Sequence, residues 1–234
     1  MSYQREELDK LLATCLERVL AGGETIRLRQ QTEYPWQDTI NITLEKAPKR
    51  EFSLFLRIPG WSETARVTVN GEVFADRLES GQYFEIRRLW SAQDRIELVM
   101  PMSVQLLQAH PLVEEVRNQA AVRRGPLVYC LESTDLPDDV GVMDVTISSG
   151  AKFRTRFTEE LLAGVTVLEG KASVLAQDEW NKALYRRISP QDTKTTEIRL
   201  IPYYAWGNRG DSEMAVWIPL RYTLQGSKFP RAKP

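Results

Sequence analysis

Neighbouring carboxylates are the first residues of this sequence that could do acid/base chemistry, and they occur as Glu114-Glu115, Asp138-Asp139 and Glu159-Glu160. A glycosidase needs two carboxyl groups that face each other across the glycosidic bond, about 5 to 9.5 Å apart. Adjacent residues of a strand point to opposite faces of a sheet, so none of these pairs meets that requirement by itself. We therefore expect all three pairs to be solvated surface residues.

The single histidine, His110, is the next candidate. Histidine is the usual general base near neutral pH, and Ser103 and Asp135 are conceivable partners for it. No nucleophile-elbow sequence is present, however. Because His110 is followed directly by a proline, a turn or interface histidine is the simpler interpretation.

The two cysteines, Cys15 and Cys130, are too far apart in sequence to form a local metal site, since no CxxC spacing exists. Two cysteines do not make a disulfide framework either, so we expect a reducing compartment, the cytoplasm. Cys15 lies on an apolar stripe and is expected to be a small core residue; a reactive thiol is the alternative.

The aromatic residues offer binding rather than catalysis. An indole ring can stack on the apolar face of a sugar, although tryptophan is more often core or interface filler. The six candidates are Trp36, Trp61, Trp90, Trp180, Trp206 and Trp217. Trp36 and Trp61 follow proline or glycine at turns, which makes them the better exposed candidates for sugar stacking.

Composition excludes several classes of protein. The chain has 234 residues, of which 42% are hydrophobic and 27% charged, as in an average soluble globular protein. The formal net charge of −1 gives no electrostatic footprint for nucleic acid and no polybasic membrane anchor. The polar N-terminus has no signal-peptide core and no run approaches a membrane span, which again favours a cytoplasmic protein.

The first 23 residues are expected to form an amphipathic helix. Their apolar residues recur at spacings of three and four, and Gly22-Gly23 then supplies a helix stop. The recurring residues are Leu8, Leu11, Leu12, Cys15, Leu16, Val19 and Leu20.

After residue 23 the period changes to two, which is typical of strands. Turn signals separate short alternating segments, and Asn70-Gly71 is the strongest hairpin signal among them. The pattern predicts a mainly β protein with two antiparallel β-sandwich domains of the jelly-roll kind, at 24–103 and 104–224, behind the N-terminal helix. Residues 225–234 are expected to be a flexible tail.

Four stretches go further: LRQQTEYPW at 28–36, LRIPGW at 56–61, RGPLVYCLE at 124–132 and IPYYAWGNRG at 201–210. In this order they resemble the C-terminal part of the β-L-arabinofuranosidase family, glycoside hydrolase family 127. The resemblance covers roughly residues 24 to 220. It implies β-sandwich domains of the kind that follow an N-terminal (α/α)6 barrel in that family.

The resemblance also implies that the family's chemistry lies in the barrel. There a zinc-bound cysteine is the nucleophile, a glutamate is the acid/base, and the zinc is held by a glutamate and cysteines, two of them adjacent. The barrel would precede residue 24, and this sequence has no adjacent cysteine pair. We therefore transfer no catalytic or zinc-binding residue to this chain and expect no cofactor in it.

The leading hypothesis is a non-catalytic accessory module that braces a catalytic (α/α)6 barrel, in cis or in trans, or mediates formation of a homodimer. The expected contact surface is the Tyr203–Gly210 turn, through Tyr203, Tyr204, Trp206, Asn208 and Arg209. The alternative is a stand-alone carbohydrate-binding module for arabinose-containing glycans, with Trp36 and Trp61 as contacts. An autonomous hydrolase with a new site is the third hypothesis.

Overall fold

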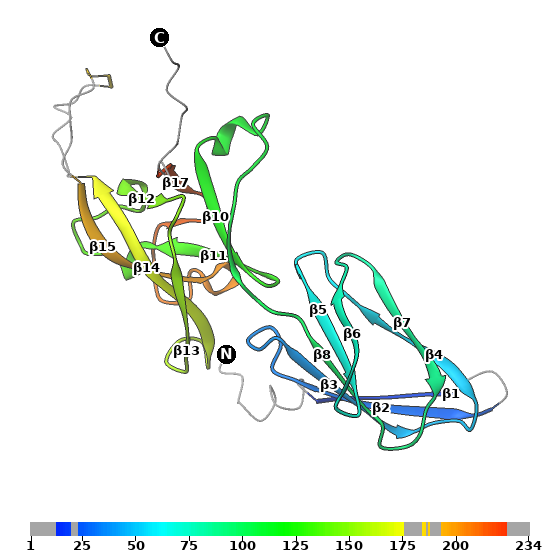
Figure 1. Ribbon diagram of the computed structural model, residues 1–234. Coiled ribbons are helices and arrows are strands. Elements are labelled where there is room, and N and C mark those ends of the chain that lie inside the picture. The colour runs from blue at the N-terminus through cyan, green and yellow to red at the C-terminus, as the bar shows by residue number, and fades with distance from the viewer. Residues whose placement is uncertain (1–12, 20–22, 176–183, 186, 188–192, 224–234) are drawn as a thin grey trace, which may run out of the picture. The chain divides into compact units, whose positions relative to one another are not determined.

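The computed structural model describes residues 13–19, 23–175, 184–185, 187 and 193–223 (Figure 1). The chain divides into two compact units. The first comprises Met1–Ser103 with Arg124–Pro126, and the second comprises Val104–Arg123 with Leu127–Pro234. The described residues are mainly β, and their helices are short 3-10 turns. None of these helices could cross a membrane.

The first unit consists of a six-stranded sheet, in the order β1-β2-β3-β8-β5-β6, and a separate two-stranded sheet, β4-β7. Every pairing within it is antiparallel. The strands are β1 (Ala13–Val19), β2 (Thr25–Thr32), β3 (Thr39–Lys46), β4 (Glu51–Arg57), β5 (Ala65–Val69), β6 (Glu72–Leu78), β7 (Tyr83–Leu89) and β8 (Arg95–Val99).

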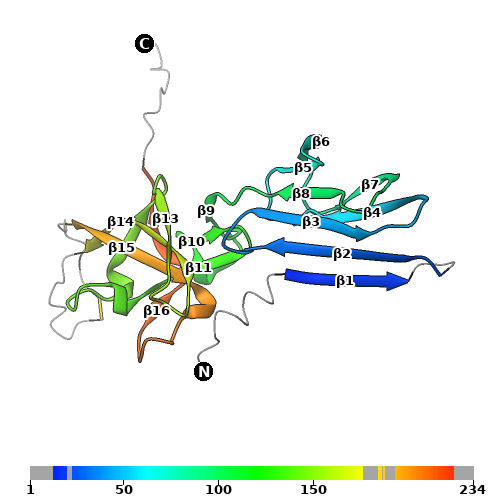
Figure 2. The ribbon, with the colours of Figure 1, turned by 90° about the horizontal axis from the view of Figure 1, so that it is seen from below.

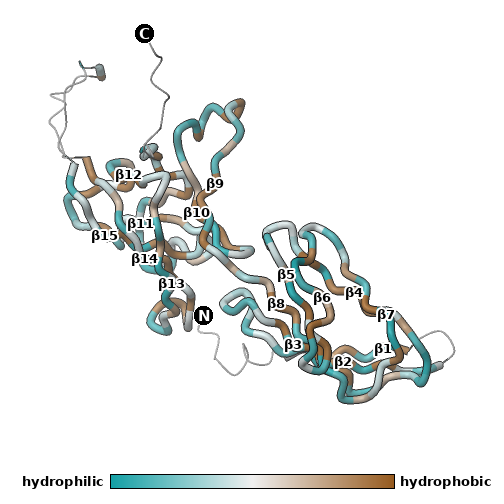
Figure 3. The backbone as a smooth tube through the Cα atoms, in the orientation of Figure 1, coloured by the Kyte–Doolittle hydropathy of each residue, from teal (hydrophilic) through white to brown (hydrophobic). Residues whose placement is uncertain are grey.

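Both sheets of the first unit contribute to one hydrophobic core. Leu44, Val67 and Ile96 come from the larger sheet, and Leu56 and Ile86 come from β4 and β7. The alternation along the strands explains this arrangement, because every second residue faces inward. Figure 3 shows the resulting mixture of hydrophobic and hydrophilic stretches along the chain.

The predicted hairpin at Asn70-Gly71 is confirmed. It joins β5 to β6, and both turn residues have positive φ, 54° and 83°, as a two-residue turn of this kind requires. The Asn70 side chain also accepts a hydrogen bond from the backbone N–H of Arg95 at 2.8 Å. The turn residue therefore fixes the neighbouring strand β8 as well.

The predicted N-terminal helix is wrong over residues 13–19, which form the edge strand β1 beside β2 (Figure 2). All seven residues of β1 pair with β2, and Glu17 forms an ion pair with Arg27 at 2.7 Å. Leu16 and Val19 remain 45% and 70% exposed, so the apolar stripe buries little in this strand. Sheet pairing has overridden a helical spacing here. The other residues of the predicted helix up to residue 22 lie outside the described residues.

Cys15 is consequently not a core residue. It is exposed on β1, and its sulfur lies 3.9 Å from a carboxylate oxygen of Glu45 on β3. The expectation that it packs in the core depended on the helical stripe, and it fails together with the helix.

The second unit is built on a nine-stranded sheet, in the order β16-β11-β15-β14-β12-β17-β10-β9, with β13 pairing β14. Its strands are β9 (Val104–Leu107), β10 (Gln119–Arg124), β11 (Leu127–Glu132), β12 (Val145–Ser148), β13 (Phe153–Thr158), β14 (Val165–Leu175), β15 (Thr193–Pro202), β16 (Met214–Ala215) and β17 (Ile218–Arg221). Its 3-10 turns are η1 (Glu114–Val116), η2 (Ser133–Asp135), η3 (Val142–Asp144) and η4 (Tyr203–Ala205).

One core cluster runs through the second unit, with Leu131, Ile147, Leu168, Leu200 and Ile218 all fully buried in it. The expectation of purely antiparallel sheets is wrong where β12 and β17 pair in parallel. This pairing joins residues more than seventy positions apart, which local turn signals do not reveal. The predicted flexible tail at 225–234 lies outside the described residues.

Candidate functional site: an aromatic turn held by buried charges

The Tyr203–Gly210 turn of the second unit presents three large aromatic side chains to solvent. Tyr203, Tyr204 and Trp206 are 47%, 57% and 42% exposed, whereas Ala205 between them is fully buried. Pro202 ends β15, and the one-turn helix η4 begins directly after it. This short helical turn directs the small alanine inward and leaves the aromatic rings outside.

The turn is closed by the Asn208 side chain. Its amide nitrogen donates to the carbonyl oxygens of Ala205 and Trp206, at 3.1 and 3.3 Å. Gly207 has a φ of 76°, a conformation in which a side chain would be strained. Asn208 thus holds the backbone beneath the exposed rings.

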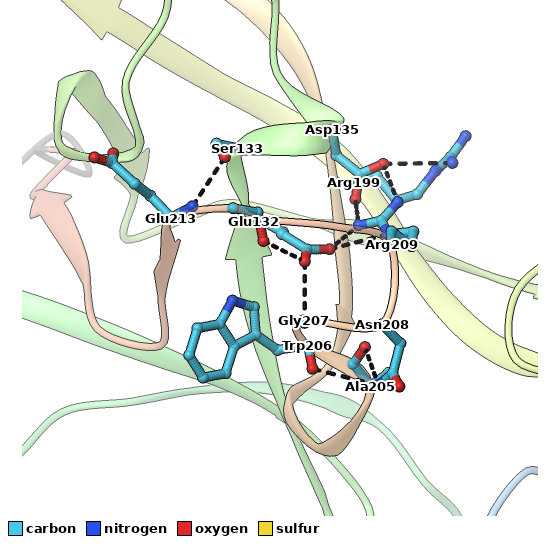
Figure 4. A network of polar contacts seen from close by, with 11 residues as sticks. Glu132, Ser133, Asp135, Arg199, Ala205, Trp206, Gly207, Asn208, Arg209 and Glu213 are labelled. Atoms are coloured by element: carbon cyan, nitrogen blue, oxygen red, sulfur yellow. Dashed lines mark hydrogen bonds and ion pairs between the residues drawn. The ribbon is translucent and has the colours of Figure 1, made fainter. Parts of the chain in front are cut away.

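A buried carboxylate fastens the turn to the body of the unit (Figure 4). Glu132, at the end of β11, is fully buried. It accepts hydrogen bonds from the Ser212 hydroxyl at 2.7 Å, the Gly207 backbone N–H at 3.2 Å and Arg209 Nε at 2.9 Å. Arg209 Nη2 donates to the same carboxylate oxygen as Nε. Charge-assisted hydrogen bonds of this kind are the stronger ones in proteins.

A second carboxylate extends the network. Arg209 Nη1 and Nη2 donate to the two oxygens of Asp135, in η2, at 3.0 and 2.5 Å. Arg199, on β15, reaches the same carboxylate at 3.5 Å. Arg209 therefore binds Glu132 and Asp135 together, and two acidic and two basic side chains form one continuous group.

The network determines the charge state of its buried members. Burial alone would raise the pKa of Glu132, but hydrogen bonds from Ser212, Arg209 and Gly207 outweigh it and hold this pKa below its usual range. Hydrogen bonding to Asp135 and Glu132 raises the pKa of Arg209. Both groups are therefore charged at neutral pH, and the turn is held by an ion pair.

The structure brings five of the predicted contact residues onto this one turn, in two different roles. The three aromatic side chains face solvent. Asn208 and Arg209 instead bond to the protein itself, and only 22% of the Arg209 side chain is exposed. They position the turn, although Asn208 is itself exposed beside the three aromatic side chains.

Trp36 and Trp61 lie in the first unit and are both half-buried. Trp61 packs against the core of that unit, and its ring is stacked on Tyr34 with 6.3 Å between the ring centroids. The backbone carbonyl of Trp36 accepts a hydrogen bond from Arg124 at 3.1 Å. Part of the Trp61 ring is thus already covered, which leaves less of its face for a sugar.

The carboxylate pairs and His110 all lie at the surface of the protein. All six residues of the carboxylate pairs are exposed, as expected. His110 is an exposed turn residue whose Nδ1 accepts a hydrogen bond from the backbone N–H of Leu112 at 3.2 Å.

Zinc does not fit the residues that the structure describes. No group of three metal-ligating side chains occurs within them. Burial raises the pKa of the Cys130 thiol to about 12, so this thiol is protonated at neutral pH when no metal is bound. Because no such group of ligands lies around it, we derive no zinc chemistry from the described residues.

Sequence reasoning did not single out Glu132 and Ser212 as site residues, and it considered Asp135 only as a partner for His110. The available signal was a charged residue at the end of an apolar strand, since Glu132 follows Tyr129, Cys130 and Leu131. Arg209, the cation that pairs with Glu132, lies 77 positions further along the chain, and no local sequence pattern connects these two residues.

The GH127 middle domain of β-L-arabinofuranosidase matches residues 15–102, and the C-terminal domain of glycoside hydrolase family 127 matches residues 104–219. A non-reducing end β-L-arabinofuranosidase of Bifidobacterium longum subsp. longum is 33% identical over 205 residues, which are 84% of this chain and 30% of that protein.

Solved structures of glycoside hydrolases are also similar to this chain. A glycoside hydrolase superposes with a TM-score of 0.83 at 44% identity, covering 89% of this chain and 34% of its own. A GH127 β-L-arabinofuranosidase from Geobacillus stearothermophilus T6 superposes with a TM-score of 0.80 at 38% identity, covering 88% of this chain and 32% of its own. This chain thus spans about a third of the length of these relatives, and it belongs to glycoside hydrolase family 127 as a match to its middle and C-terminal domains.

Proposed function

We propose that the chain is a non-catalytic accessory module of a β-L-arabinofuranosidase-like glycoside hydrolase, and that it braces a catalytic barrel supplied in cis or in trans. The matched regions support this, because they are the middle and C-terminal domains of the family. We also propose that both units are β-sandwiches of the jelly-roll kind. The core of the first unit, which is shared by two separate sheets, supports that assignment for this unit.

The observation that carries the proposal is the exposed aromatic turn on a rigid base. Tyr203, Tyr204 and Trp206 offer large apolar surfaces with polar tips, which are the side chains enriched in protein interfaces. The ion pair of Glu132 with Arg209 fixes the turn before any partner arrives. Preorganisation of this kind reduces the conformational entropy lost on binding. The turn is therefore suited to form a wall against a barrel, or against a second copy of the chain.

The test uses the N-terminal part of the Geobacillus relative, produced without the region that this chain matches. Binding of the intact chain to it is measured by biolayer interferometry, with the complete relative as the comparison because its own C-terminal region already occupies that place. We expect saturable binding to the N-terminal part only. Trp206→Ala should weaken this binding by about tenfold or more, as loss of an interface tryptophan does.

Tyr222→Ala is the matched control, because Tyr222 is also an exposed aromatic residue of the second unit. Its replacement should leave the affinity unchanged. Equal loss in both variants would argue against a specific role of the turn. Hydrolysis of an aryl β-L-arabinofuranoside by the purified chain alone would contradict the non-catalytic assignment.

A further inference from the structure

A groove of about 1140 Å³ lies on the second unit, and none of the three exposed aromatic residues of the turn lines it. It crosses strands β13, β14 and β15, which are neighbours in the sheet and lie side by side in Figure 1. Two loop segments also line it, one around Thr134–Leu136 and the other from Ser148 to Lys152. From its lining we infer that this groove binds a neutral oligosaccharide, a function that goes beyond the docking proposed above.

Side chains of opposite charge alternate from strand to strand along the exposed floor of the groove. The strand register places Arg154 opposite Glu169, and Glu169 opposite Arg199. Arg154 and Glu169 form an ion pair at 2.7 Å, and Arg199 lies 3.5 Å from Asp135. Positive and negative groups thus alternate across the width of the groove.

A second pair of opposite charges lies two residues further along β14 and β15. Lys171 of β14 lies opposite Glu197 of β15, and their charged atoms are 3.6 Å apart. Together the lining residues carry three carboxylates and four cations, and a carboxylate lies within 4 Å of three of those cations. Opposite charges largely cancel, so the groove offers many hydrogen-bonding groups but little net field.

These groups fit hydroxyls better than ions. A sugar hydroxyl can donate to a carboxylate oxygen and accept from an adjacent guanidinium N–H at the same time. An anionic ligand would instead meet three cations that each have a carboxylate within 4 Å, and Lys152 is the one lining cation for which no such carboxylate is found among the described residues. Adjacent carboxylate and guanidinium groups therefore recognise the neighbouring hydroxyls of a neutral sugar.

Phe153 adds the apolar component that a sugar ring requires. Its half-buried ring lines the groove and lies over Gly170, where an added Cβ would come within 2.7 Å of Phe153 Cδ1. The absence of a side chain at position 170 lets the ring approach the backbone of β14 closely. The C–H face of a sugar can pack on such a ring.

The size of the groove favours a chain of sugars over a single one. Its volume exceeds the roughly 300–1,000 Å³ that pockets for small molecules occupy. The alternating charges extend across the three strands β13, β14 and β15, which agrees with an extended ligand.

The test is a titration of the intact chain with short neutral oligosaccharides of pentoses, including arabinose, and of hexoses. Binding is followed by isothermal calorimetry and by amide chemical shifts. We expect saturable binding of at least one oligosaccharide, with shifts in β13, β14 and β15. Arg154→Ala and the double change Lys171→Ala with Glu197→Ala should each lower the affinity by about tenfold or more, because each removes charge-assisted hydrogen bonds.

The exposed ion pair of Arg117 with Glu114 provides the matched control, since it lies in the same unit outside the groove. Replacing both of its members by alanine should leave the affinity unchanged. Amide spectra of each variant establish that it is folded. Glu197→Gln, which retains a hydrogen-bonding side chain, should bind more tightly than Glu197→Ala.

Ionic strength distinguishes a neutral ligand from an anionic one. Raising it from about 0.1 M to about 1 M shortens the Debye length from about 10 Å to about 3 Å, which weakens the binding of an anion. Binding of a neutral sugar should change little. No saturable binding by any oligosaccharide, equal binding in groove and control variants, or a steep loss with salt would each overturn the inference. Trp206→Ala should leave sugar binding unchanged, so this inference and the docking proposal can fail separately.

Discussion

Replacement of Arg209 by alanine is the most informative perturbation of the candidate site. The change leaves Glu132, which is fully buried, with only Ser212 and Gly207 as hydrogen-bond donors. Removing one partner of a buried ion pair typically costs about 3–5 kcal/mol, because an uncompensated charge stays in the interior. For a protein of this size such a loss lowers the Tm by roughly 10 °C. Thermal and urea unfolding of the second unit measure it directly.

The penalty should also depend on pH, and its sign follows from the pKa of Glu132. In the native protein this pKa is lowered, so the carboxylate stabilises the fold above its unfolded pKa of about 4.3, and that contribution is lost as the pH falls through the folded value. Without Arg209, the effect of burial dominates and raises the pKa of Glu132. The variant then gains stability relative to the native protein as the pH is lowered from about 7 towards about 4.

Two further variants test whether the loss of stability comes from the buried charge of Glu132. Arg117→Ala removes a guanidinium from an exposed ion pair and should change stability very little. Glu132→Gln, introduced together with Arg209→Ala, removes the stranded charge and should recover part of the lost stability. A penalty for Arg209→Ala no larger than that for Arg117→Ala, or one that does not change with pH, would refute the buried ion-pair argument.

Two further predictions concern packing and thiol reactivity. Gly170→Ala should destabilise the second unit by about 1–3 kcal/mol because its Cβ would overlap an aromatic ring, whereas Gly60→Ala, which has no neighbour within 4 Å, should be near neutral in urea unfolding. Equal costs would contradict the close contact. In the folded protein a thiol reagent at about pH 8 should modify exposed Cys15 rapidly, while Cys130, buried and with a pKa raised to about 12, should react only after unfolding. Rapid modification of both cysteines would contradict this.

Local patterns predicted the strands because most of them bury one face. The Asn70-Gly71 hairpin is an example, since its turn chemistry and the alternation on both sides agree. The segment at 13–19 failed for the opposite reason. As the edge strand β1 it leaves Leu16 and Val19 exposed, so burial does not impose a period of two on its sequence. Its helical spacing therefore carried no information about the structure that it adopts.

The candidate site was predictable in part. The position of the aromatic residues came from the resemblance and from the turn, and the structure leaves about half of each of the three side chains exposed. Their support was not predictable, because Glu132 and Arg209 lie far apart in the chain and meet only when β11 and the segment after β15 come together. Long-range ion pairs leave no periodic signal in a sequence.

The parallel pairing of β17 has a consequence for how the protein is made. β17 lies between β12 and β10 in the sheet, although it is the last of the described strands to be synthesised. When β16 has been synthesised, all the other described strands of the second unit already exist, but the strand that joins β12 to β10 does not. Sheets closed by such distant segments fold slowly and expose unpaired edges meanwhile. The second unit is thus expected to complete its fold only after translation has passed residue 221, whereas the first unit can fold while the rest of the chain is still being made.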